Sequence, residues 1–368
     1  MASNKILLTG ATGYIGGTVL TTLLASSEPA IKGSSISVLV RKEEQAAVLR
    51  GLGVNPIIFK GLDDVEALRR AASEHDAVIH TASSQHDASA VALIQGLGDR
   101  KKATGKEVHF IHTGGTSALG DQAVSGRLVE RRVFNDKTDD IFAYERQRQA
   151  KDVYDQRTTD LAILEAGEAA EVKTYIIMPP TIYGIGTGAF NRVSIQVLAI
   201  MRAARRDGFT TLVRGARDQE WGHVHVTDLA MLYELILARA LDSSSSSSSV
   251  PPPPSGRKGL YFAVTGHHSW GEVADRVARE GHRLGYVASP EVREVPLAEA
   301  GGPLGSALGG PIGGQGLSPQ LTEAAWASHV KTEPALAREL GWKPVKDRRD
   351  FEESFALEWT EDVEGSRK

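Results

Sequence analysis

Three glycines near the N-terminus, Gly10, Gly13 and Gly16, follow one another at intervals of three in the segment TGATGYIGG. They come after the apolar run Lys5–Thr9 and open a stretch, Ile15–Leu24, whose pattern predicts a helix. At such a turn the first glycine permits the tight bend, the second lets a pyrophosphate approach the backbone, and the third lets the helix pack close to the strand. The phosphates then lie at the positive helix N-terminus. The sequence therefore predicts a dinucleotide-binding turn.

Two cations follow the second apolar run, Ile36–Val40, where the adenine ribose is held in such folds. An acidic residue there suits the ribose of NAD, whereas Arg41 and Lys42 suit a 2′-phosphate, because a guanidinium can bind a phosphate through two hydrogen bonds. The alternative is that both side chains simply end a strand in water. We expect NADP(H), with NAD(H) as the second choice.

Strand-like runs alternate with helical patterns over the first half of the chain, which predicts βαβ units and a parallel sheet. The predicted strands are Lys5–Thr9, Ile36–Val40, Asn55–Phe59, Ala77–Ala82, Val108–Thr113 and Lys173–Met178. The expected fold class is α/β, a Rossmann-type doubly wound sheet with a smaller C-terminal part that covers the substrate.

The predicted domains are residues 1–183, which bind NAD(P), and residues 184–368, which mainly bind substrate, with 211–230 returning to the first domain. Residues 243–255 are of low complexity and predict a disordered surface loop. The glycine-rich residues 300–316 predict a second mobile loop, and the tail from Pro319 to about Glu361 reads as helical.

Composition excludes several classes of function. The 368 residues include no cysteine, so disulfides, thiolate catalysis and cysteine-bound metals are ruled out. A net charge of −4 gives no reason to expect nucleic acid or an anionic membrane as partner. No His, Asp and Glu cluster has metal-ligand spacing, so we expect no metal. A cytoplasmic protein with a small-molecule substrate is expected, and a homodimer is possible.

An ordered set of motifs resembles the extended short-chain dehydrogenase/reductase family, also called the NAD-dependent epimerase/dehydratase family. The motifs are TGATGYIGG (9–17), GLDD (61–64), VIHTA (78–82), HTGGTS (112–117), PPTIYG (179–184) and GHVHVTDLA (222–230). The resemblance implies cofactor contacts from Gly10, Thr12, Gly13, Tyr14, Ile15, Gly16, Arg41, Lys42, Leu62, His80, Thr81, Ala82, Thr113, Pro179 and Ile182.

The catalytic motif departs from this family, which pairs a Ser or Thr after the fifth strand with Tyr-x-x-x-Lys on the next helix. Alignment puts Gly115 at the serine position, and Thr116 and Ser117 are the nearest hydroxyls. Counting back from the sixth strand reaches Tyr154, with Arg157 one helical turn further on. We expect Thr116, Tyr154 and Arg157 to replace the usual groups, the arginine biasing the tyrosine toward phenolate.

A second tyrosine gives Tyr-x-x-x-Arg at Tyr144, on a charged stretch, Arg127–Lys151, that reads as an insertion. Tyr183 after the sixth strand and Trp221 are candidates for the substrate pocket. Packing explains Tyr183 equally well, and core packing is the default for Trp221. We expect Asp160 to lie on a solvated helix face, with a role as acid or base as the alternative.

Three functions remain open from the sequence. The first is an NADP(H)-dependent oxidoreductase acting on a small organic carbonyl, imine or hydroxyl compound. The second is a lyase, isomerase or cyclase that keeps the nucleotide as a structural element. The third is a non-catalytic module that senses NADP(H).

Overall fold

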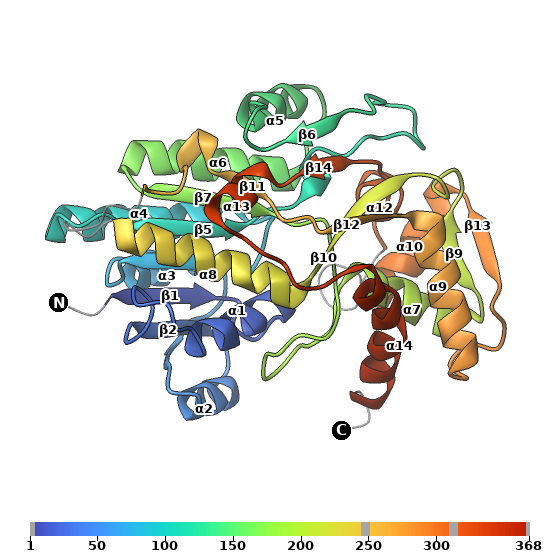
Figure 1. Ribbon diagram of the computed structural model, residues 1–368, viewed down its shortest axis with the longest axis horizontal. Coiled ribbons are helices and arrows are strands. Elements are labelled where there is room, and N and C mark those ends of the chain that lie inside the picture. The colour runs from blue at the N-terminus through green and yellow to red at the C-terminus, as the bar shows by residue number, and fades with distance from the viewer. Residues whose placement is uncertain (1–3, 244–250, 309–315, 366–368) are drawn as a thin grey trace.

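A wholly parallel sheet forms the centre of the computed structural model, which describes residues 4–243, 251–308 and 316–365 (Figure 1). Its strands are β1 (Lys5–Thr9), β2 (Ser35–Val40), β3 (Asn55–Ile58), β4 (Ala77–His80), β5 (His109–Thr113), β7 (Lys173–Met178) and β11 (Leu260–Phe262). Within the described residues they are hydrogen-bonded in the order β11-β7-β5-β4-β1-β2-β3. The six predicted strands are all present, so the doubly wound α/β fold is confirmed.

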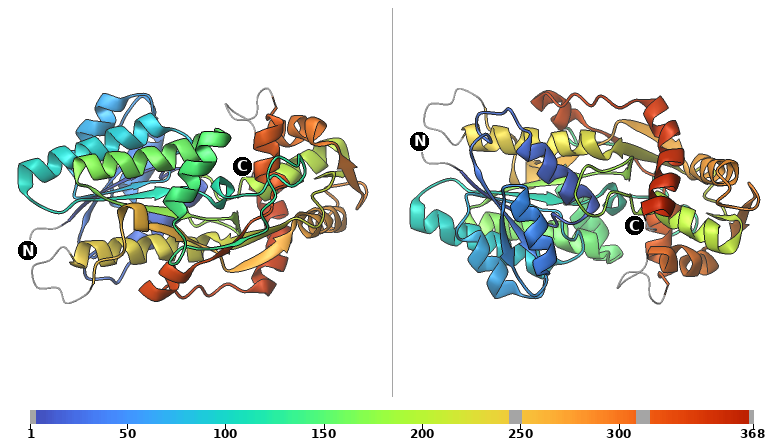
Figure 2. Two further views of the ribbon diagram at one scale, coloured as in Figure 1. Left: turned by 90° about the horizontal axis from the view of Figure 1, so that it is seen from above. Right: turned by 90° about the horizontal axis from the view of Figure 1, so that it is seen from below.

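Both faces of this sheet are buried, because successive side chains of each strand enter two different apolar clusters. In β1, Ile6 and Leu8 pack on one face and Leu7 on the other. The first face is covered by α1 (Tyr14–Leu24), α2 (Glu43–Gly51) and α8 (Val226–Ser243), and the second by α3 (Val65–Ala72), α4 (Asp87–Thr104) and α6 (Asp155–Ala170). Figure 2 shows α4 and α6 on one side of the sheet and α8 on the other.

The remaining elements lie mostly beyond the carboxyl ends of the large sheet (Figure 1). They form three small sheets, β8-β10-β12, β9-β13 and β6-β14, within the described residues. Their strands are β6 (Val133–Asn135), β8 (Thr181–Tyr183), β9 (Thr210–Val213), β10 (Glu220–His225), β12 (Gly266–Ser269), β13 (Val292–Val295) and β14 (Lys331–Glu333). The helices are α5 (Ile141–Lys151), α7 (Gln196–Asp207), α9 (Trp270–Arg283), α10 (Leu297–Leu308), α12 (Pro319–Trp326), α13 (Ala335–Leu340) and α14 (Arg348–Gly365).

The chain returns twice to the large sheet after residue 183. Helix α8 packs against α1, and strand β11 pairs in parallel with β7 at the sheet edge. Residues 210–213, by contrast, belong to β9, which pairs with β13 outside the large sheet. The two parts of the molecule are therefore interleaved in sequence.

The glycine-rich stretch was expected to be a mobile loop, and that prediction is wrong for residues 300–308, which belong to α10. Ala300 and Leu304 are buried there, and a Cβ at Gly305 would lie 2.9 Å from the Leu317 backbone nitrogen. These glycines allow close packing rather than mobility. Residues 309–315 lie outside the described residues.

The low-complexity segment is described only from residue 251, since 244–250 lie outside the described residues. Residues 251–255 have no regular structure, and the Pro254 carbonyl accepts a 2.6 Å hydrogen bond from the Tyr261 hydroxyl. The tail is helical as expected in α12, α13 and α14, with the short strand β14 between the first two.

A buried carboxylate, Glu358 of α14, fixes the segment that follows β8. It accepts hydrogen bonds from the Gly184 backbone N–H (2.8 Å) and the Ser194 hydroxyl (2.7 Å), and the Tyr14 hydroxyl donates to the Gly184 carbonyl (2.6 Å). Burial raises the pKa of Glu358 to about 7, although its two hydrogen bonds oppose this. One buried carboxyl thus connects the C-terminal helix to the segment that follows β8.

Replacing Glu358 with glutamine should make stability less sensitive to pH. Between pH 4.5 and 7 the unfolded chain releases this proton before the folded protein does, so folding is progressively penalised as pH rises. Across that range the free energy of unfolding of Glu358→Gln should gain about 3 kcal/mol relative to wild type. Urea unfolding followed by circular dichroism at several pH values measures this. Glu364→Gln, exposed on the same helix, is the control, and a difference that does not change with pH contradicts the prediction.

Candidate active site

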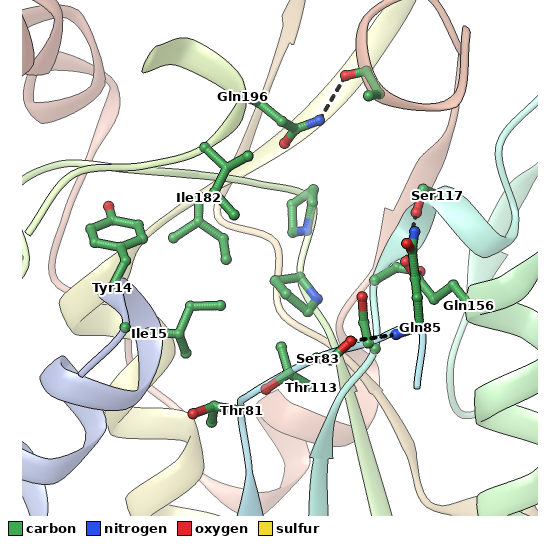
Figure 3. A pocket seen from close by; sticks show the side chains of 18 of the residues that line it. Tyr14, Ile15, Thr81, Ser83, Gln85, Thr113, Ser117, Gln156, Ile182 and Gln196 are labelled. Carbon is green, nitrogen blue, oxygen red and sulfur yellow. Dashed lines mark hydrogen bonds between the residues drawn. The ribbon is translucent and has the colours of Figure 1, made fainter. Parts of the chain in front are cut away.

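A cavity of about 480 Å³ lies between the carboxyl ends of the large sheet and the smaller part of the molecule. Its lining residues come from the glycine-rich turn, from the segments that follow β4, β5 and β7, and from β10, α7 and α12. Figure 3 shows Tyr14 and Ile15 on one side of this space and Ser117 and Gln156 on the other. Ligands of open parallel sheets bind at this edge, so the cavity is the candidate active site.

The glycine-rich turn fits the phosphates of a dinucleotide. Gly10 has φ +79°, and a Cβ there would lie 2.7 Å from the Thr81 hydroxyl, while a Cβ at Gly16 would overlap the Gly10 carbonyl. Gly13 is the N-cap of α1, whose first turn holds no acidic residue and no side-chain cap. The backbone N–H groups at this helix end therefore suit an anion.

The structure brings about half of the predicted cofactor residues to the cavity wall. These are Gly13, Tyr14, Ile15, Thr81, Ala82, Thr113, Pro179 and Ile182. Gly10 and Gly16 shape the turn beneath it, and Thr12 accepts a hydrogen bond from the Asn191 backbone N–H. Arg41 and Lys42 are exposed at the end of β2, and Leu62 is half-buried; none of these three lines the cavity.

His80 does not point where we expected. Its ring is completely buried and lies 2.7 Å from the Thr9 hydroxyl and 3.3 Å from the Ser89 hydroxyl, away from the cavity wall. Burial lowers its pKa to about 3, so the imidazole is neutral. His80 ties β4 to β1 and α4, which is a structural role.

The hydroxyl that accompanies Tyr154 is Ser117, which corrects the prediction of Thr116. Thr116 is fully buried, and its hydroxyl lies away from the cavity. The two residues begin a 3₁₀ turn, in which neighbouring side chains point about 120° apart, so counting along the sequence could not decide between them.

Ser117 belongs to a short hydrogen-bonded chain along the cavity wall. The Tyr154 hydroxyl donates to Ser117 Oγ (3.1 Å), and the Ser117 hydroxyl donates to Gln156 Oε1 (3.0 Å). Gln156 Nε2 in turn donates to the Gly115 carbonyl (2.7 Å). All four residues line the cavity, so the structure offers a tyrosine–serine pair oriented by an amide.

Arg157 lies behind Tyr154 rather than in the cavity. Its guanidinium is 5.3 Å from the centre of the Tyr154 ring and donates to the carbonyls of Ala118 (2.9 Å) and Asp152. Burial raises the pKa of Tyr154, and the Ser117 hydrogen bond and the Arg157 charge oppose this only in part. The expected bias toward phenolate is therefore outweighed by desolvation.

The second candidate tyrosine, Tyr144 on α5, lies in the insertion and away from the cavity. Its hydroxyl donates to Glu130 (2.8 Å) and accepts from Arg148 (3.0 Å), and it does not line the cavity. The Tyr-x-x-x-Arg spacing on this helix thus reflects a local polar cluster and not the candidate active site.

Only one of the two predicted substrate residues, Tyr183 and Trp221, lines the cavity. Tyr183 is fully buried and packs edge-on against His223, His225 and Phe351. It does not line the cavity, so the prediction that it belongs to the substrate pocket is wrong. Trp221 of β10 does line the cavity. It also packs against Trp270, with ring centres 5.7 Å apart.

Asp160 was expected to be solvated, but it is completely buried. It lies 3.9 Å from the His112 ring, and burial and the nearby Glu145 raise its pKa. A buried neutral carboxyl beneath Gly114 is consistent with these surroundings.

Much of the cavity wall has no recognisable sequence motif. Gln85, Asn191, Ile195, Gln196, Leu317, Leu321, Ala325 and Trp326 all line it. Only the N-cap serine before α12, Ser318, which accepts from the Leu321 N–H, marks one of these elements in the sequence. Among residues 4–243, 251–308 and 316–365, no group of three or more His, Asp or Glu is placed to hold a metal ion, and no helix has the length and apolar character of a membrane span.

Comparison with known proteins agrees with this geometry. Residues 6–99 match the model of the NAD dependent epimerase/dehydratase family. The oxidase ucsJ of Acremonium sp is 28% identical over 351 residues, which are 93% of each chain. Two solved structures share the fold: DesIV, a dTDP-glucose 4,6-dehydratase from Streptomyces venezuelae with NAD and TYD bound (TM-score 0.64, 16% identity, 98% of each chain), and vestitone reductase from alfalfa (TM-score 0.57, 16% identity, 98% of this chain and 99% of that one).

The relatives are named for enzymatic activities, and their fold extends over nearly the whole chain. The family that the sequence motifs resemble is therefore also the family whose model matches residues 6–99, and the chain as a whole has the fold of these solved structures.

Proposed function

We propose that this protein is an NADP(H)-dependent oxidoreductase that reduces a small organic carbonyl or imine compound, or oxidises the corresponding hydroxyl or amine. The observation that carries the proposal is the Tyr154–Ser117 hydrogen bond of 3.1 Å inside a cavity that also contains the glycine-rich turn. A proton donor and a dinucleotide cradle in one cavity are what reduction of a carbonyl requires.

Different segments of the chain are proposed to bind the cofactor and the substrate. The N-terminus of α1 would hold the phosphates, and the cavity-lining segments after β4, β5 and β7 would hold the nicotinamide end. The bound cofactor supplies or accepts the hydride. We assign residues 1–183, with α8 and β11, to cofactor binding, and the rest of the smaller part to the substrate.

Tyr154 acts as the proton donor in this proposal. Burial raises its pKa, so at neutral pH the phenol carries the proton that reduction would transfer to the substrate. Ser117, held by Gln156, orients the substrate oxygen or nitrogen toward it. Arg157 is a positioning residue, because it touches the Tyr154 ring and not the cavity.

Replacing Tyr154 with phenylalanine should lower kcat about 100-fold or more while leaving the Kd for NADPH within a factor of about two, because a positioned acid contributes 10²–10⁴-fold. Steady-state oxidation of NADPH with a panel of ketones and imines, alongside NADPH fluorescence titration, measures both. Ser117→Ala should show a smaller loss of the same kind.

Tyr144→Phe is the matched control, since this tyrosine also lies about one helical turn before an arginine, Arg148, but is outside the cavity. Full turnover in Tyr154→Phe contradicts the proposal. If wild type binds NADPH and forms product with no net change in its absorbance, the chain is instead a lyase, isomerase or cyclase that retains its nucleotide.

The preference for NADP(H) over NAD(H) is assigned to Arg41 and Lys42, which are exposed at the carboxyl end of β2. Arg41→Ala should weaken NADPH binding about tenfold, since it removes a charge-assisted hydrogen bond, and leave NADH binding unchanged. Calorimetric titration with each nucleotide measures this, with Lys32→Ala, an exposed cation before the opposite end of β2, as control. Equal losses for both nucleotides would overturn the assignment.

A further inference from the structure

One part of the cavity wall is made mainly of apolar and aromatic side chains. Trp221, Ile195, Leu317, Leu321, Ala325 and Trp326 line it, and they come from β10 and from the segments that begin α7 and form α12. The polar side chain among them, Gln196, is a neutral amide, which Figure 3 places at the far side of the space from Thr81 and Thr113. Apolar and aromatic walls of this kind bind ligands mainly by excluding water from carbon surface.

Two reciprocal hydrogen bonds hold this wall together. Gln196 Nε2 donates to the Ala325 carbonyl (2.7 Å), and Trp326 Nε1 donates to the Gln196 carbonyl (3.1 Å). The single side-chain donor of Trp326 and one of the two N–H groups of the Gln196 amide are therefore used within the protein. What Trp326 offers to a ligand is the surface of its ring, because its single donor is already used.

The charges nearest the site face away from it. Arg157 and Arg148 lie behind the Tyr154–Ser117 pair, where Arg157 donates to the Ala118 carbonyl (2.9 Å) and Arg148 to the Gly120 carbonyl (3.3 Å). In the described part of the chain the cavity wall holds no charged side chain, and the sequence of residues 309–315, GGPIGGQ, contains none.

We infer that the substrate is an uncharged, largely apolar, compact carbonyl or imine compound, and that anionic compounds such as phosphate-bearing sugar nucleotides are rejected. This inference rests on the proposed function. An anion held against the wall formed by β10, α7 and α12, away from the N-terminus of α1, would lose its hydration and find no counter-charge, whereas a flat apolar molecule gains from contact with Trp326, Trp221 and Leu321. The cavity of about 480 Å³ must also admit the nicotinamide end of the cofactor, which favours a small substrate.

A binding experiment tests this independently of turnover. The neutral fluorescent ketone 6-acetyl-2-dimethylaminonaphthalene is titrated into the full chain, and its blue shift reports an apolar site. Competition with 1-indanone should displace it, whereas 1-indanone-5-carboxylate and UDP-glucose should need at least roughly 100-fold higher concentrations. Equal displacement by the ketone and its carboxylate overturns the inference, as does failure of both the probe and 1-indanone to bind.

Variants that place a charge at Leu321, in the apolar wall, test the substrate class further. Leu321→Asp should weaken the probe at least about tenfold, and Leu321→Arg should favour the indanone carboxylate over 1-indanone relative to wild type by about tenfold. Leu357→Asp, at an exposed leucine of α14, is the matched control and should change neither value. NADPH titration and circular dichroism confirm that each variant is folded. Unchanged selectivity in both Leu321 variants contradicts the inference.

The outcomes separate the two proposals. If 1-indanone binds selectively but no carbonyl compound oxidises NADPH, the proposed function fails and the substrate class stands. If NADPH is oxidised with the indanone carboxylate or a sugar nucleotide as efficiently as with neutral ketones, the function stands and the substrate class fails.

Discussion

The molecule depends on one close approach: the turn between β1 and α1 packs against the end of β4 with no room for a side chain. Thr81 occupies the space that a Cβ at Gly10 or Gly16 would need, and its hydroxyl donates to the Thr9 carbonyl (2.7 Å). This contact sets the direction in which α1 leaves the sheet, and hence where its N-terminal N–H groups point. It also places Tyr14, whose hydroxyl holds Gly184 and through it the C-terminal helix.

The cavity that begins at this turn also contains Tyr154, and the burial of Tyr154 is the second constraint on the site. A phenol in water would respond to Arg157 by losing its proton more easily, but here desolvation outweighs the nearby cation. Arg157 is hydrogen-bonded to backbone carbonyls and does not line the cavity. Retention of the proton on the tyrosine, rather than its removal, is the consequence.

The fold and the cofactor turn could be predicted because their signals are local. The apolar run Lys173–Met178 predicted a strand, and β7 has the same two ends. The glycine spacing predicted the turn that leads into α1. The candidate site could be predicted only in part. Ser117 rather than Thr116 lines the cavity because the two residues begin a 3₁₀ turn. Tyr183 lies outside the cavity and packs against Phe351 on α14, a residue far away in sequence. The wall made by α12 could not be found at all, since apolar residues on a helix look alike whether they face a core or a ligand.

The most direct test of the central claim, that Tyr154 is a buried proton donor, needs no substrate. The protein is labelled with ¹³Cζ-tyrosine, the Tyr154 resonance is assigned by its absence in Tyr154→Phe, and its shift is followed with pH. We predict that this resonance stays at the phenol position up to about pH 10, because burial holds its pKa above the ordinary value of 10.0. A midpoint near neutral pH would show a phenolate stabilised by Arg157 and contradict the claim.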